Sequence, residues 1–393
     1  MKDIRILALI LCACFVPVAW GRPQACTAYT PWAQFHRHNM QRFNPCEKVL
    51  NVNNVGRLHT KWNYTPVDGG PTSAAVANGA VYVGSYPSGT VDALNARTGT
   101  LLWSYQTGGG IVSSPAVANG VVYIGSRDNN VYALNASTGA KLWSYTTGFY
   151  VDSSPAVANG VVYVGSDDNN LYALNASTGV KLWSYATGNA IQASPAVTNG
   201  VVYVDSDDGN LYALQASTGT LLWSYPVGVS YYLYLAPSPA VANGVVYVGS
   251  DNNSVYALNA STGTLLWSYT TGDIVVSTPA VANGVVYITS ADNNVYALNA
   301  STGAPLWSYN ICWEWCNPQF SSPAVANGVV YVGSEGGLYN GYAYALDAST
   351  GALLWSQASL GGNSSPAVAN GMVYFSSPNG TVYALDLKKG QKN

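Results

Sequence analysis

Residues 131–145 read Val-Tyr-Ala-Leu-Asn-Ala-Ser-Thr-Gly-Ala-Lys-Leu-Trp-Ser-Tyr, and close copies of this stretch recur along almost the whole chain. Apolar and aromatic residues at 131–136 and again at 142–145 favour two extended segments. The residues between them, from Asn135 to Gly139, have the composition of a turn in which glycine adopts a positive φ. The unit is therefore predicted to be a strand, a turn and a second strand.

A second signature alternates with the first: residues 115–124 read Pro-Ala-Val-Ala-Asn-Gly-Val-Val-Tyr-Ile. An Asn-Gly pair between apolar runs predicts a tight hairpin, because a type I′ turn needs positive φ at both central residues. Copies of this hairpin recur about every 40 residues, which is the period of β-propeller blades. They begin near Ala75, Ala116, Ala156, Ala196, Ala240, Ala280, Ala324 and Ala367.

Together the two signatures predict an all-β chain, an eight-bladed β-propeller of four-stranded antiparallel blades over residues 58–393. In the second blade we expect strands A to D at 113–119, 121–126, 131–136 and 141–146. The chain ends with a C strand at 381–386 that no D strand follows, whereas a D strand at 58–65 has no blade before it. Pairing these two strands completes the eighth blade and removes the exposed edges.

The motif at Ala133, Asn135, Thr138, Gly139 and Trp143 resembles the tryptophan-docking motif of the pyrroloquinoline-quinone (PQQ) repeat family. That family includes quinoprotein alcohol dehydrogenases and a cofactor-free propeller lipoprotein of the outer-membrane assembly machinery. The resemblance covers roughly residues 58–386 and implies that each tryptophan packs between neighbouring blades. These structural residues are Trp62, Trp103, Trp143, Trp183, Trp223, Trp267, Trp307 and Trp355.

Two segments precede the repeats. Residues 1–21 have basic residues, an apolar run and the small-residue site Ala19-Trp20-Gly21, which indicates a signal peptide and a secreted or periplasmic location. Cleavage after Gly21 is favoured over lipidation at Cys14. Residues 22–57 form an aromatic leader that we expect to pack on the ring, with Trp32 and Phe35 buried; catalytic or ligand roles for His36 and His38 are the alternative.

Four cysteines remain after the signal peptide, and an even number in an exported chain predicts disulfides. Three pairings are possible, and proximity in sequence favours Cys26 with Cys46 and Cys312 with Cys316. No histidine lies at zinc-ligand spacing from them, so no metal site is predicted.

Charged residues make up 8% of the chain and the formal net charge is −3. This composition does not favour nucleic-acid binding. We expect a monomer with no transmembrane segment in the mature chain.

In each predicted blade the B–C and D–A loops share one face of the ring, here called the loop face, and the A–B and C–D turns share the other, the turn face. The turn face is nearly invariant between repeats, so a specific site is expected on the loop face. Asp152 and Asp205 are weak catalytic candidates, because a carboxylate pair beside an amide could bind a cation or act as a base. Gln192, Arg127 and Asn363 are weak cofactor-binding candidates. The alternative is that all of these are solvated loop residues.

Two longer loops interrupt the repeat and carry aromatic residues that favour a contact surface for a protein or glycan. The alternative is that these rings cover the channel or a neighbouring blade. The candidate partner-binding residues are Tyr231, Tyr232 and Tyr234 in one loop and Trp313, Glu314 and Trp315 in the other.

Two functions are compatible with these features. The preferred hypothesis is an exported, non-enzymatic propeller that binds partners through its loop face, with no cofactor. The alternative is a PQQ-dependent dehydrogenase that oxidises an alcohol or sugar and binds PQQ with calcium. The dehydrogenase hypothesis is weakened by the absence of an adjacent Cys-Cys pair and of a haem motif.

Overall fold

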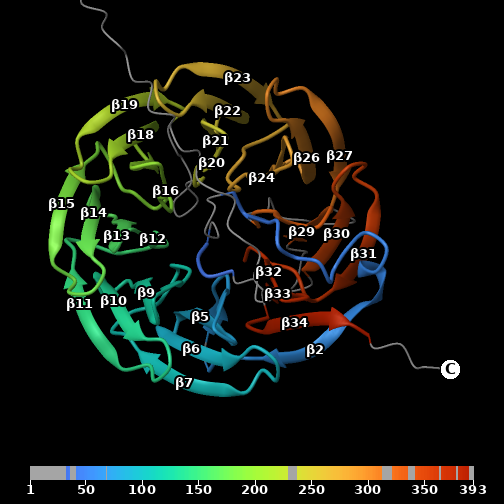
Figure 1. Cartoon of the computed structure of the whole chain (residues 1–393), viewed down its shortest axis with the longest axis horizontal. Helices are drawn as coiled ribbons and strands as arrows, with labels where there is room; N and C mark the ends of the chain where they lie inside the picture. Colours follow the sequence, from blue (N-terminus) through green and yellow to red (C-terminus); the bar gives the residue numbers. More distant parts are fainter. Residues whose placement is uncertain are drawn as a thin grey trace, which may run out of the picture.

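The computed structural model describes residues 32–35, 41–67, 69–228, 237–311, 321–334, 341–362, 364–377 and 379–388. Within these ranges the strands form eight sheets arranged as a closed ring, with the first strand of each blade innermost (Figure 1). The predicted eight-bladed propeller is therefore confirmed. None of the helices in the described ranges has the length and apolar character needed to cross a membrane.

Blade 2 shows the common design: β8 (Ala116–Ala118), β9 (Val121–Gly125), β10 (Asn130–Asn135) and β11 (Lys141–Thr146) pair in chain order as an antiparallel sheet. Asn119 and Gly120 both have positive φ, 50° and 76°, as the predicted hairpin requires. Strand A is shorter than the predicted 113–119. One reason is that the Ser114 N–H donates to the Ser154 hydroxyl of the next blade instead of to strand B.

The other blades repeat this design with the following strands. Blade 1 contains β4 (Ala75–Ala77), β5 (Ala80–Pro87), β6 (Thr90–Asn95) and β7 (Leu101–Gln106), with β3 (Gly69–Pro71) beside β5; blade 3 contains β12 (Ala156–Ala158), β13 (Val161–Gly165), β14 (Asn170–Asn175) and β15 (Lys181–Ala186); blade 4 contains β16 (Ala196–Thr198), β17 (Val201–Ser206), β18 (Asn210–Gln215) and β19 (Leu221–Pro226); blade 5 contains β20 (Ala240–Ala242), β21 (Val245–Gly249), β22 (Ser254–Asn259) and β23 (Leu265–Thr270); blade 6 contains β24 (Ala280–Ala282), β25 (Val285–Thr289), β26 (Asn294–Asn299) and β27 (Pro305–Asn310); blade 7 contains β28 (Ala324–Ala326), β29 (Val329–Ser334), β30 (Tyr342–Asp347) and β31 (Leu353–Ala358); blade 8 contains β32 (Ala367–Ala369), β33 (Met372–Ser376), β34 (Val382–Leu387) and β2 (Leu58–Tyr64).

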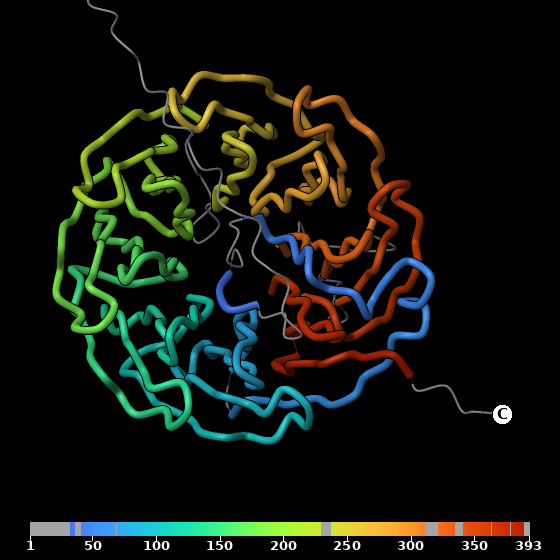
Figure 2. The backbone as a smooth tube through the Cα atoms, in the orientation of Figure 1, coloured from blue at the N-terminus to red at the C-terminus, as the bar shows by residue number. Residues whose placement is uncertain are grey.

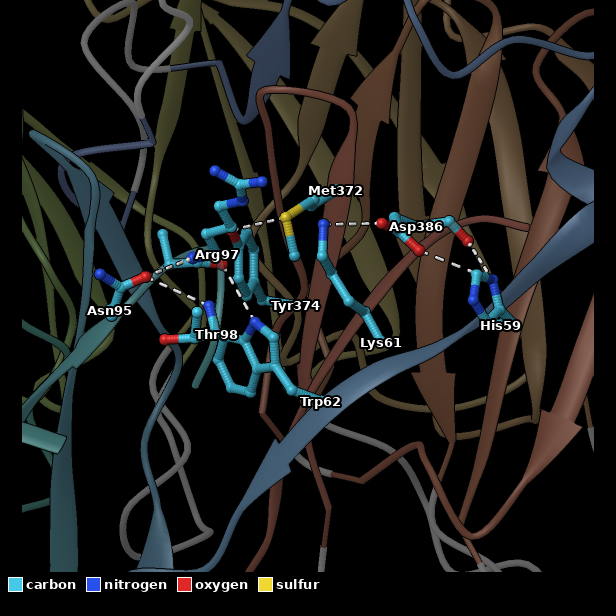
Figure 3. A network of polar contacts seen from close by, with 10 residues as sticks. His59, Lys61, Trp62, Asn95, Arg97, Thr98, Met372, Tyr374 and Asp386 are labelled. Carbon is cyan, nitrogen blue, oxygen red and sulfur yellow. Dashed lines mark hydrogen bonds and ion pairs between the residues drawn. The ribbon is translucent and has the colours of Figure 1, made fainter. Parts of the chain in front are cut away.

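Blade 8 joins the two ends of the chain, because β2 pairs antiparallel with β34. An ion pair on the outside of this sheet links Lys61 Nζ to Asp386 at 2.7 Å (Figure 3). On the inside, the indole N–H of Trp62 donates to the Ala96 carbonyl of blade 1 at 3.0 Å. The predicted closure of the ring by an N-terminal D strand is thus present.

Neighbouring blades are held together by a tryptophan and a tyrosine that reach the next C–D turn. The Trp143 indole and the Tyr123 hydroxyl both donate to the Ala176 carbonyl, each at 3.0 Å. Gly179 lies under the Trp143 ring, where a Cβ would come within 2.7 Å. We call this contact the interblade latch. It recurs from blade 1 to blade 7, at Trp103, Trp143, Trp183, Trp223, Trp267 and Trp307.

The leader runs along the inner edges of the A strands near the axis of the ring. Figure 2 shows residues 41–57, in blue, passing from the middle of the ring to its rim beside β31. Without the leader, the edge N–H groups of the A strands would lack partners. The Val76 N–H donates to Trp32, Val117 to Ala33, Val281 to Gln41 and Val325 to Arg42. Here β1 (Phe43–Asn44) pairs parallel with β28, and η1 (Val55–Arg57), a 3-10 helix, precedes β2.

Arg42 fixes the leader at the start of the inner strands of blades 7 and 8. Its side chain is 1% exposed and donates to the carbonyls of Pro323, Ser322 and Pro366. Burial lowers the pKa of its guanidinium to about 9. Its charge also lies over the Trp32 ring, 5.5 Å from the ring centroid. The leader is therefore packed into the ring by polar as well as apolar contacts.

Candidate functional site

Four B–C loops of the loop face contain the same structural carboxylate, two residues after the serine at the end of strand B. In blade 2, Asp128 Oδ2 accepts the Gly108 N–H at 2.7 Å and the Tyr132 hydroxyl at 2.6 Å. These bonds join the B–C loop to the preceding D–A loop. Asp168, Asp208 and Asp292 do the same in blades 3, 4 and 6.

The residue directly after this serine, by contrast, varies among the blades. It follows the second strand from the axis, and it lies beside the D–A loop residue that precedes the next innermost strand. This position is therefore on the inner part of the loop face, where a site specific to one blade can form. From blade 1 to blade 6 it is occupied by Tyr86, Arg127, Asp167, Asp207, Asp251 and Ala291.

In blade 2 this position forms an ion pair with a predicted site residue. Arg127 Nη2 lies 2.7 Å from Asp152 Oδ2, and Arg127 Nε donates to the same carboxylate. The guanidinium also lies over the rings of Tyr86 and Tyr150, at 4.9 and 5.6 Å from their centroids. Arg127 and Asp152 thus neutralise each other within a buried, aromatic surrounding.

In blade 3 the position is a carboxylate that forms no ion pair with a described residue. The amide of the predicted site residue Gln192 donates to Asp167 Oδ2 at 3.4 Å. The other oxygen, Asp167 Oδ1, is buried and accepts no hydrogen bond. Burial, and then the nearby Asp152 carboxylate, raise the pKa of Asp167 to about 6.

Blades 4 and 5 continue the series with Asp207 and Asp251. Asp207 is 8% exposed and its Oδ1 accepts no hydrogen bond. Burial, then the Asp167 and Asp251 carboxylates on either side, raise the pKa of Asp207 to about 7. We call Asp167, Asp207 and Asp251 the carboxylate row.

Asp205 lies next to this row, at the end of β17, and is 4% exposed. Burial, then the carboxylates of Asp207, Asp208 and Asp251, raise its pKa well above the ordinary value of an aspartate. Its Oδ1 has no hydrogen-bond partner. Asp205 is therefore less exposed than Asp152 and Asp207, which are 7% and 8% exposed.

The residues equivalent to Asp205 in other blades show how little space a side chain has at this position. The equivalent residue of blade 2 is Gly125, where a Cβ would come within 2.4 Å of the Val151 carbonyl in the following D–A loop. In blade 6 it is Thr289, whose hydroxyl donates to the Ser321 carbonyl. Both Asp205 and Thr289 are followed by one of the longer D–A loops.

The structure thus places the candidates from the sequence in different surroundings. Asp152 pairs with Arg127, and Gln192 contacts Asp167, whereas Asp205 is surrounded by Asp207, Asp208 and Asp251. The roles predicted for these residues stay predictions. Asp167, Asp207 and Asp251 are not among the candidates from the sequence, because Asp and Asn in a short loop are typical of turns.

The remaining candidates lie outside the described residues. They are Asn363, the loop aromatics Tyr231, Tyr232, Tyr234, Trp313 and Trp315 with Glu314, and the cysteines Cys26, Cys312 and Cys316. Cys46 is buried, and its predicted pairing with Cys26 stays a prediction. In the described part of the chain, no three His, Cys, Asp or Glu side chains are grouped so that they could hold a metal ion.

The repeats, latches and ring closure define this chain as a PQQ-repeat β-propeller. The sequence matches the family model of the outer membrane protein assembly factor BamB over residues 37–149, 150–233, 229–311 and 313–393. Because these matches cover most of the chain, the protein belongs to that family. No curated protein sequence matches it.

Solved structures with the same fold include BamB and several dehydrogenases. BamB from Moraxella catarrhalis superposes with a TM-score of 0.70 at 21% identity, over 86% of this chain and 99% of BamB. A europium-containing methanol dehydrogenase gives 0.73 at 16% identity, over 90% and 89%. The quinohemoprotein alcohol dehydrogenase from Comamonas testosteroni gives 0.75 at 15% identity, over 94% and 82%. At these identities the likeness establishes the fold alone.

Proposed function

We propose that this protein is an exported, non-enzymatic propeller that binds a protein partner through its loop face. The observation that carries the proposal is the position of the leader. Trp32 and Arg42 are each 1% exposed and lie against the inner strands near the axis. The chain's own residues therefore fill part of the ring where a cofactor on the axis would need room.

The distribution of variation supports the same function. The interblade latch and the structural aspartates of the B–C loops are repeated with little change, so they hold the fold. The residue directly after the serine at the end of strand B changes from aromatic to basic to acidic around the ring. A surface that varies on a constant scaffold is typical of a binding face.

The family supports a location in the cell envelope and a partner there. The matching model is described as an outer membrane protein assembly factor. We infer export by the predicted signal peptide of residues 1–21, with cleavage after Gly21. The predicted aromatic loops, with Trp313 and Trp315, would extend the binding face.

The described residues do not fit PQQ, which is a tricarboxylate. Its carboxylates would meet Asp167, Asp207 and Asp251, whose like charge is repulsive. Arg127, which follows strand B on the same face, is already paired with Asp152. The described residues also lack a cluster of ligands for the calcium that accompanies PQQ. We therefore derive no dehydrogenase chemistry for this chain.

Site-specific photo-cross-linking tests the proposed function. A photoreactive amino acid replaces Phe149, which is 47% exposed on the loop face, in cells that export the protein. The matched control replaces Ser137 in an exposed C–D turn of the same blade. We expect a discrete cross-linked protein from position 149 and none from position 137. Equal cross-linking from both positions would contradict a binding site on the loop face.

Titration with PQQ, with and without calcium, tests the enzyme alternative. A ligand at 100 times its Kd stabilises the folded state by about 2.7 kcal/mol, which melting experiments detect readily. We expect no shift. A shift that Asp152→Ala or Asp205→Ala abolishes would overturn the proposal in favour of a dehydrogenase.

A further inference from the structure

The carboxylate row and the buried Asp205 together indicate what kind of group the loop face binds. The three residues of the row occupy the same loop position in blades 3, 4 and 5, which are adjacent in the ring. They are close enough for each neighbour's charge to raise the pKa of Asp207. Negative charge is therefore concentrated on three consecutive blades.

Asp205 supplies a second observation, independent of the row. It stands where five other blades have glycine, and it is almost completely buried. Its Oδ1, like that of Asp207, has no hydrogen-bond partner. Buried carboxylate oxygens are expected to accept hydrogen bonds, because desolvation without them is costly. The two oxygens thus leave acceptor capacity unused in the protein itself.

Asp205 and Asp207 form no ion pair in the described part of the chain, although the charge of Arg127 acts to lower the pKa of Asp167. Among the described residues, ion pairs join Arg127 to Asp152 and join His59 and Lys61 to Asp386. None involves Asp167, Asp205 or Asp207. A positive group from outside the chain would therefore supply both the missing charge and the missing donors.

The geometry favours an organic cation over a metal ion. A divalent metal needs several oxygen ligands converging on one point, and the described carboxylates do not converge in that way. A guanidinium or ammonium group carries several N–H donors and can bridge carboxylates that are farther apart. We propose that Asp205 and Asp207, supported by Asp167 and Asp251, bind the guanidinium or ammonium group of a ligand at the loop face.

This inference rests on the proposed binding function and names the chemistry of its ligand. The cation can belong to a free small molecule or to an arginine or lysine side chain of a partner. Isothermal titration with two probes distinguishes these sources. One probe is agmatine, a small molecule with a guanidinium and an ammonium group, and the other is the tripeptide acetyl-Gly-Arg-Gly-amide. Butylurea is the neutral control.

We expect saturable binding of at least one probe and none of butylurea. Asp205→Asn and Asp207→Asn should each weaken binding at least tenfold. These variants keep the size of the side chain, and their melting curves report whether they fold. Asp386→Asn removes the same charge at the closure of the ring, on blade 8, and should change the affinity less than twofold.

Three results would overturn the inference: no binding of either probe, binding of calcium chloride without binding of a probe, or equal effects of Asp207→Asn and Asp386→Asn. Each is separable from failure of the proposed function. If position 149 cross-links a partner while neither probe binds, the binding function stands and the cation site falls. If a probe binds while no partner cross-links, the cation site stands and the protein-binding function falls.

Discussion

Gly120 and Gly139 have almost the same backbone conformation but different surroundings. Their φ angles are 76° and 73°, values that residues with a Cβ rarely adopt. Around Gly120 a Cβ would meet nothing within 4 Å, whereas at Gly139 it would come within 2.6 Å of the Trp103 ring. Gly120 is thus required only for its positive φ. Gly139 is required both for its positive φ and because the Trp103 ring leaves no space for a Cβ.

We predict that Gly139→Ala is more destabilising than Gly120→Ala. Gly120→Ala has only the cost of positive φ, about 1 kcal/mol. Gly139→Ala adds a collision with the Trp103 ring and weakens the interblade latch, for a total of about 2–4 kcal/mol. Urea unfolding of both variants measures the difference. Equal midpoints would show that the latch tolerates the extra methyl group.

Arg42 provides a second test at the scale of one residue. Arg42→Met removes the donors of three blade carbonyls, and each buried unsatisfied acceptor costs about 1–3 kcal/mol. We expect a loss of at least about 3 kcal/mol in the free energy of unfolding, measured by urea denaturation. Arg42→Lys keeps the charge but not the planar set of donors. Its free energy of unfolding should therefore lie between those of the wild type and Arg42→Met. A neutral effect of Arg42→Met would mean that the leader does not contribute to stability.

At the scale of elements, the repeats predicted the strands and the ring closure well, because period-2 patterns and Asn-Gly turns are local signals. The A strands were predicted too long. Their first residues bond sideways to the next blade, as Ser114 does to Ser154, and no local pattern contains that partner. The leader's bonds to successive A strands were likewise hidden, since they join residues distant in sequence.

The candidate site was only partly predictable for a related reason. Asp152 and Gln192 can be proposed from the sequence, because they are polar residues at equivalent positions, three before the proline that precedes each A strand. Asp167 and Asp207 cannot, because an Asp-Asp pair in a short loop is typical of a turn. The structure separates them: Asp168 and Asp208 bond to the turn, whereas Asp167 and Asp207 keep an oxygen without a partner.

The strand that closes the ring allows a matched comparison of two tryptophans. Trp62 of β2 is buried and its indole bonds to Ala96, so Trp62→Ala should cost about 3–5 kcal/mol. Trp355 of β31 is only partly buried, and blade 8 offers it no C–D turn because its outer strands come from opposite ends of the chain. We therefore expect Trp355→Ala to cost less than half as much. Thermal unfolding of both variants checks this order, and a larger loss for Trp355→Ala would contradict the role given to the latch.

At the scale of the whole molecule, the loop face combines a rigid ring with an uncompensated group of acids. Charged residues are only 8% of the chain, so few other charges screen this group. The charges of Asp152, Asp168 and Arg127 act on Asp167, whereas the carboxylates of Asp208 and Asp251 act on both Asp205 and Asp207. The free energy of unfolding of the ring is therefore expected to depend on pH.

We predict that the free energy of unfolding falls as the pH rises from about 5 to about 8. An aspartate in the unfolded chain has a pKa near 4, whereas in the folded protein Asp167 titrates near 6 and Asp207 near 7. Between these values the folded state binds more protons, so stability is greatest in acid and is lost as the pH passes the folded pKa values. The opposite shift of Asp347, whose pKa is lowered by its hydrogen bond from Ser349, acts only below about pH 4.

After allowance for screening by solvent, the fall should be about 1–3 kcal/mol, measured by urea unfolding at a series of pH values. Asp207→Asn should make the free energy of unfolding depend less steeply on pH. It should also raise stability at pH 8, because an amide has no charge to desolvate. Asp386→Asn should leave the slope unchanged, since that carboxylate is paired with Lys61 at the ring closure. A stability that is flat or rises from pH 5 to pH 8 would mean that Asp167 and Asp207 are charged at little cost in the folded protein. The carboxylate row would then have no need of an external cation.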